Sequence, residues 1–177
     1  GFLMNKRSDM VQYIRAMQER LLRESRSDLL RFTLATMPTF RPADFHRRYY
    51  SVLTSFAHGE IKKLMVFMPP QHGKSEGSTR RLPSFLLGLC PDHRLAIVSY
   101  NAPKARKFNR EIQRIIDSPE YHAIFPETCL NASNVTTIAG SWLRNADECE
   151  IVGHRGGFKT VGVGGALTGE PVDILIM

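Results

Sequence analysis

The sequence predicts an α/β fold with a mainly parallel sheet flanked by helices. Three short apolar runs, at residues 64–68, 95–100 and 172–177, have the length and composition of buried strands. A helix is expected between the first two runs, starting near Lys74, and the stretch after the second run carries apolar residues at helical spacing. Strands that alternate with helices in this way are typical of a parallel sheet.

Length and composition are those of a globular chain with one real core. The chain has 177 residues, of which 42% are hydrophobic and 23% are charged. No apolar run is long enough to span a bilayer, and no signal peptide is recognisable. The three cysteines, Cys90, Cys129 and Cys149, are spaced neither as a disulfide framework nor as a zinc site. We divide the chain into an N-terminal helical segment, residues 1–43, and a core, residues 44–177.

The N-terminal part is predicted to be helical. Met10, Ile14, Met17 and Leu21 form one stripe of an amphipathic helix over residues 9–24. A second helix is expected to end near residue 36, before a proline. A third is expected at residues 45–57, with the preceding aspartate, Asp44, as its cap and a glycine, Gly59, at its end.

The core begins with the run at residues 64–68, predicted to be a strand buried on both faces. A five-residue loop follows, and a helix should start near Lys74, with Pro83 kinking or ending it. After the strand at residues 95–100, Asn101 should cap a helix. The buried stripe of that helix is Ala105, Phe108, Ile112 and Ile115, and its other faces are basic.

The last third of the chain is expected to form shorter strands and turns over residues 131–152, and then a glycine-rich segment, residues 153–169. This segment has two interpretations. It either brings Arg155 and Lys159 to a nucleotide or to a neighbouring subunit, or it is a hairpin that needs glycine for its turns. Residues 172–177 are then the third buried strand, with Asp173 at its entrance.

The net charge is +7, and the excess is concentrated in residues 1–50, which hold ten basic and five acidic side chains. A basic surface favours polyanions such as nucleic acid. The alternative is a solvated helix face with no partner.

The chemistry-bearing motif is the loop that ends in Gly73-Lys74-Ser75. At the start of a helix the backbone N–H groups lack internal partners and can bind phosphate oxygens. Gly73 allows close approach, Lys74 would reach the β- and γ-phosphates, and Ser75 would ligate Mg²⁺. The position five residues before Gly73, usually glycine in such loops, is Met68. The alternative is an ordinary strand–helix turn.

Several stretches in order resemble the large terminase subunits, the motors that pump DNA into phage capsids. These are residues 67–76, residues 95–100 with the basic helix that follows, residues 115–121, residues 162–169 and residues 173–177. The resemblance covers the chain from about Phe45 onward. It implies a P-loop NTPase fold of the additional-strand type.

The resemblance also implies ligands and partners. ATP and Mg²⁺ would be bound by Pro70, Gln71, His72, Gly73, Lys74, Ser75 and Glu76, with Ser75 on the metal. Lys74 would be catalytic, with Arg155 or Lys159 as the arginine-finger-type cation, because Pro70 and Gln71 stand where relatives often carry a loop arginine. Expected partners are double-stranded DNA, a portal protein, a small terminase subunit and further copies in a ring, with no membrane, in the cytoplasm of a host cell.

Two alternatives to a DNA-translocating motor stay open: a non-hydrolysing nucleotide-binding assembly fragment, and another P-loop enzyme such as a helicase. The acids that position Mg²⁺ and water normally follow the last strand, so they are expected after Met177. Asp173 precedes that strand and is no substitute. We therefore expect the chain as given to bind ATP weakly and to hydrolyse it negligibly.

Overall fold

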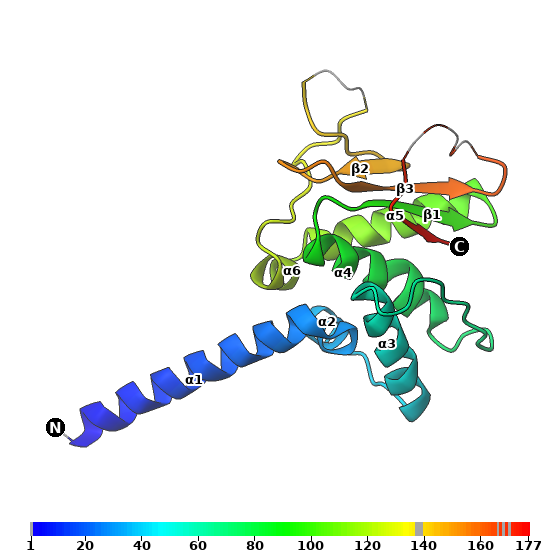
Figure 1. Ribbon diagram of the computed structural model, residues 1–177. Coiled ribbons are helices and arrows are strands. Elements are labelled where there is room, and N and C mark those ends of the chain that lie inside the picture. The colour runs from blue at the N-terminus through cyan, green and yellow to red at the C-terminus, as the bar shows by residue number, and fades with distance from the viewer. Residues whose placement is uncertain (1, 137–139, 166, 168, 170) are drawn as a thin grey trace.

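The computed structural model describes residues 2–136, 140–165, 167, 169 and 171–177, and the side chains from residue 8 onward within these ranges. Three helices open the chain: α1 (Phe2–Ser27), α2 (Leu29–Thr36) and α3 (Asp44–Ala57). In Figure 1, α1 extends away from the rest of the molecule, whereas α2 and α3 lie against it. The predicted helices are therefore confirmed, and α1 is longer than predicted.

The sheet has four described strands, β1 (Arg94–Ser99), β2 (Glu148–Glu150), β3 (Gly157–Gly162) and β4 (Ile174–Ile176), in the order β2-β3-β1-β4. β1 pairs in parallel with both β3 and β4, and β2 is antiparallel to β3. The sheet is thus mixed, mostly parallel, and flanked by helices, which confirms the α/β class. β2 and β3 form a hairpin, so one of the two interpretations of the glycine-rich segment holds for its first half. Residues 166, 168 and 170 lie outside the described residues.

Two helical segments connect the loop at residues 69–73 to β1. A π-helical segment, η1 (Glu76–Arg81), continues into α4 (Leu82–Leu89). Pro83 lies in the first turn of α4 and does not end the helix. The expected kink is replaced by the π-helical stretch before it.

After β1 the chain forms α5 (Ala102–Ile116) and α6 (Pro119–Ile124). The side chain of Asn101 accepts a hydrogen bond from the Lys104 N–H at 2.9 Å, so the predicted cap is confirmed. The predicted stripe of α5 is buried, and α5 packs along β3 and β1.

The core joins the N-terminal helices to the α/β part. Phe32 of α2 contacts the rings of Phe85, Tyr121 and Phe125 at centroid distances of 5.5 to 5.9 Å. Leu29 and Phe32 have no exposed surface. The apolar face of α2, which lies within residues 1–43, is therefore buried against α4 and α6.

Three predictions about local structure are wrong in whole or in part. Residues 172–177 are not a fully buried strand, because β4 covers Ile174–Ile176 only and Val172, Leu175 and Met177 are 40%, 48% and 90% exposed. The described residues 64–68 form no strand, and Met65 and Phe67 are 79% and 86% exposed. A continuous apolar run indicates two-sided burial only when neighbours cover both faces, and here Leu64, Val66 and Met68 alone pack against the core. Asp44 is not the cap of α3, because the cap position is Ala43 and Asp44 is the first helical residue.

The apolar stripe of α1 is exposed. Met10, Ile14, Met17 and Leu21 have exposed fractions of 47% to 59%, so none is covered by the described part of the chain. No described helix combines the length and the apolar character that crossing a bilayer requires.

Candidate phosphate-binding loop

The loop at residues 69–73 joins the extended segment 64–68 to a helical turn that begins at Lys74. In Figure 1, β1 and β3 point toward the side of the molecule on which the chain between α3 and η1 lies. The carboxyl ends of parallel strands are where open α/β sheets bind ligands. The candidate loop therefore lies on the favourable side of the sheet.

The backbone of the loop is unusual. Gly73 has φ 79°, and Gln71 has φ 62°, which is rare for a residue with a side chain. A Cβ at Gly73 would lie 3.1 Å from Nε2 of His46, so this position favours glycine for both conformation and space. Left-handed non-glycine residues cost free energy and persist where their surroundings hold them.

Two α3 side chains hold the loop. The imidazole of His46 lies 3.2 Å from the carbonyl oxygen of His72 through Nε2, and its Nδ1 lies 3.0 Å from the Ala43 N–H. The tautomer with the proton on Nε2 satisfies both contacts. The hydroxyl of Tyr49 donates to the carbonyl oxygen of Lys74 at 2.7 Å. Burial raises the pKa of Tyr49, so this hydroxyl stays protonated and can donate.

The predicted phosphate-binding side chains are distributed as follows. Lys74 is exposed and Ser75 is half-buried at the start of the helix. The Nδ1 of His72 lies 2.7 Å from the carbonyl oxygen of Pro70, which gives this histidine a hydrogen-bonding role within the loop. The first N–H groups of a helix lack intrahelical acceptors, so this turn can present donors to an anion.

Glu76, predicted to belong to the phosphate site, is paired with two arginines. Its carboxylate accepts from the Arg81 guanidinium at 2.7 Å and from Arg80 at 3.3 Å, and Arg80 also contacts Glu111 on α5. Arg81 is buried and donates in addition to Thr36. These contacts connect the helical segment after the loop to α2 through Thr36 and to α5 through Glu111.

Arg155 and Lys159 lie apart from the loop. The backbone N–H of Arg155 donates to Asp92 at 3.1 Å, next to the turn that precedes β1, and this bond lowers the pKa of the Asp92 carboxyl. Arg155 is thus at the amino ends of the parallel strands. Lys159 lies within β3, opposite Glu148 of β2. Contact of Arg155 with a nucleotide at the loop of its own chain is unsupported, and its role in a neighbouring subunit stays a prediction.

A metal site is not evident from clustering alone. Within the described residues, no group of three or more His, Cys, Asp or Glu side chains could hold a metal ion. Mg²⁺ at phosphate sites often takes only one or two protein oxygens and keeps several waters. The half-buried hydroxyl of Ser75 fits such a ligand, so its assignment stays a prediction.

Sequence reasoning missed His46 and Tyr49. Both lie about 25 residues before the loop, and their roles depend on how α3 packs against it. The sequence placed both residues in a predicted helix and gave no other sign that they contact the loop. Which face of that helix meets the loop is decided by tertiary packing.

No protein-family model matches the chain, and no significant match was found among curated proteins or among solved structures. The resemblance described above therefore rests on the residues quoted for it.

Proposed function

We propose that this chain binds the phosphates of ATP with Mg²⁺ at residues 69–75. The observation that carries the proposal is the conformation of the loop: Gly73 is left-handed, is followed at once by Lys74 and Ser75 at a helix start, and is held by α3. A backbone fixed in this way presents N–H donors without reorganising, which favours anion binding.

Each group of the loop would bind a different part of Mg²⁺-ATP. Backbone N–H groups at the start of the helical turn would bind phosphate oxygens, and the ammonium of Lys74 would neutralise their charge. The hydroxyl of Ser75 would hold Mg²⁺, which supplies charge stabilisation for phosphoryl transfer. His46 and Tyr49 keep the loop in place by binding its carbonyl oxygens.

The finer proposal is that ATP hydrolysis drives movement of duplex DNA, as in terminase large subunits. Its support is the ordered resemblance from about Phe45 onward together with the basic net charge of +7. A motor must move along any sequence, so it should bind phosphates and ignore base edges.

The test is Mg²⁺-ATP binding by the wild-type chain and by Lys74→Ala, measured by titration calorimetry. Loss of a hydrogen bond to a charged group weakens binding by about 10- to 100-fold, and any ATP turnover should disappear with it. Ser75→Ala should weaken only the Mg²⁺-dependent part of binding. Lys63→Ala is the matched control, because it removes an exposed lysine at the far end of segment 64–68.

If Lys74→Ala and wild type bind Mg²⁺-ATP with equal affinity, residues 69–75 are not the phosphate-binding site. Binding of Mg²⁺-ATP without turnover would favour the non-hydrolysing assembly role over the motor.

A further inference from the structure

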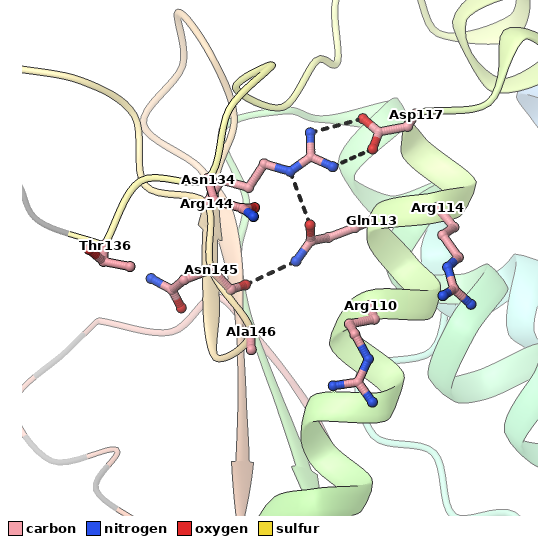
Figure 2. A pocket seen from close by; sticks show the side chains of 9 residues that line it. All are labelled: Arg110, Gln113, Arg114, Asp117, Asn134, Thr136, Arg144, Asn145 and Ala146. Atoms are coloured by element: carbon pink, nitrogen blue, oxygen red, sulfur yellow. Dashed lines mark hydrogen bonds and ion pairs between the residues drawn. The ribbon is translucent and has the colours of Figure 1, made fainter.

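A cavity lies between α5 and the described residues 134–136 and 144–146. Its volume is about 480 Å³, and Figure 2 shows its lining. The α5 wall carries Arg110 and Arg114, and the opposite wall carries Asn134, Thr136 and Asn145. We call this cavity the α5 groove. None of its lining residues belongs to the phosphate-binding loop.

One arginine of the groove is structural. Arg144 pairs with both carboxylate oxygens of Asp117, donates to Gln113 at 3.0 Å, and donates to the Asn131 carbonyl oxygen at 2.6 Å. Gln113 in turn donates to the carbonyl oxygen of Asn145 at 2.9 Å. Figure 2 shows the bonds of this network that join Arg144, Asp117, Gln113 and Asn145. The network joins the two walls, and it leaves Asp117 neutralised.

Arg110 and Arg114 take no part in this network. Arg110 and Arg114 are exposed on α5, and within the described residues neither has an ion pair or a hydrogen bond through its side chain. By contrast, the exposed Arg106 on the same helix is paired with Asp147. With Asp117 already paired to Arg144, the two free guanidinium groups give the groove a net positive charge.

We propose that the α5 groove binds the phosphate backbone of duplex DNA, with Arg110 and Arg114 as the phosphate ligands. This inference rests on the proposed function for its choice of polyanion. It assigns the contact to α5 and not to the basic N-terminal residues.

The geometry of α5 suits a phosphate backbone. Arg110 and Arg114 are four residues apart, which is about 6 Å along a helix axis, and exposed Lys107 extends the row to about 10 Å. Phosphates on one strand advance about 3.4 Å per nucleotide along the duplex axis, so a row of this length that runs along the axis would pass about three of them. The neutral amide and hydroxyl groups of Asn134 and Thr136 on the facing wall are ordinary phosphate donors.

The experiment compares wild type with the double variant Arg110→Ala/Arg114→Ala on a labelled mixed-sequence duplex, over a range of salt concentrations. Each phosphate contact contributes about 0.9 to the slope of log affinity against log salt. Losing two contacts should lower the slope by about 1.8 and reduce affinity by about 60-fold near 0.1 M salt. Unchanged circular dichroism and melting temperature would show that the variant is folded.

The matched control is Arg15→Ala/Arg23→Ala, which removes the same charge from exposed positions of α1. We expect it to bind with nearly wild-type affinity. Equal losses of duplex affinity in the two double variants would show a general effect of net charge and would overturn the assignment of DNA binding to the α5 groove. A loss confined to the α1 variant, or no duplex binding by wild type, would also overturn it. Displacement of the duplex by inorganic phosphate at constant ionic strength would indicate a site for single anions and contradict a backbone site.

ATP binding by the same proteins separates this inference from the proposed function. If the groove variant binds duplex normally while Lys74→Ala loses ATP, the groove assignment fails and the loop assignment stands. If the groove variant loses duplex binding while Lys74→Ala still binds ATP normally, the groove assignment stands and the loop assignment fails.

Discussion

Two apolar runs of similar composition differ in structure and burial: residues 95–99 form a paired strand, and residues 64–68 do not. Residues 95–99 lie within β1, which pairs on both sides, so that Ile97 lies between Thr160 of β3 and Ile176 of β4. Residues 64–68 have no regular secondary structure and form no ladder with any described strand. Ile97 has no exposed surface, whereas Phe67 is 86% exposed.

The difference teaches that an apolar run does not specify its neighbours. Residues 64–68 keep the period of two that a strand would show, since Leu64, Val66 and Met68 pack inward and the residues between them face outward. What they lack is a partner for their backbone groups and a cover for the outer face. Local composition therefore indicates an extended segment, and tertiary pairing decides whether it is a strand.

The largest expected effect that tests this comparison is Ile97→Ala. Removing a fully buried isoleucine from the centre of the sheet leaves a cavity and should lower the free energy of unfolding by about 2–5 kcal/mol. Urea denaturation followed by circular dichroism measures it. Ile97→Val is the conservative control and should cost about 0.5–1.5 kcal/mol. A cost below that of the control would show that β1 is not the centre of the core.

Elements with local signals were predictable. Asn101, followed by a proline and by apolar residues at helical spacing, specified the start and the buried face of α5, and the structure confirms both. The glycine-rich segment 153–169 left a hairpin as one of two interpretations, and β2 and β3 form a hairpin whose second strand lies in this segment. The exposure of residues 65 and 67 was not predictable, because it arises from tertiary structure: no described strand pairs with residues 64–68.

The candidate sites divide in the same way. The sequence identified Gly73, Lys74 and Ser75, because their chemistry is contiguous along the chain. His46 and Tyr49, which hold the loop, come from α3 and become neighbours only on folding. The α5 groove likewise needed the structure, since the facing wall at residues 134–136 and 144–146 is distant in sequence from Arg110.

A smaller effect should come from the edge of β1, where Asp173 ties β4 to Arg94. The carboxylate accepts from the Arg94 backbone N–H at 2.8 Å and from its guanidinium at 2.9 and 3.0 Å, and these bonds lower the pKa of Asp173. A lowered pKa contributes stability above the unfolded-state value of about 3.9, and this stability is lost as the pH falls below it. Both side chains are more than a third exposed, so we expect Asp173→Asn to cost about 1 kcal/mol at neutral pH.

The variant should also lose part of the decline in stability on acidification, because asparagine does not titrate. Denaturation of wild type and variant across the acid range measures this decline. Asp9→Asn, on exposed α1, is the control for a change in net charge. An acid dependence as steep in Asp173→Asn as in wild type would show that the pair with Arg94 does not hold β4 in place.

The smallest effect is expected for the double variant Met65→Ser/Phe67→Ser. Both side chains face solvent, so their replacement removes almost no buried apolar area, and the free energy of unfolding should change by no more than about 0.5 kcal/mol. Val66→Ala, on the inward side of the same segment, is the matched control and should cost about 1 kcal/mol, because it loses partly buried methyl groups. Denaturant unfolding of the three proteins under one condition measures both values. If the double variant costs more than the control, Met65 and Phe67 are covered in solution, and residues 64–68 have the two-sided burial that their composition predicts.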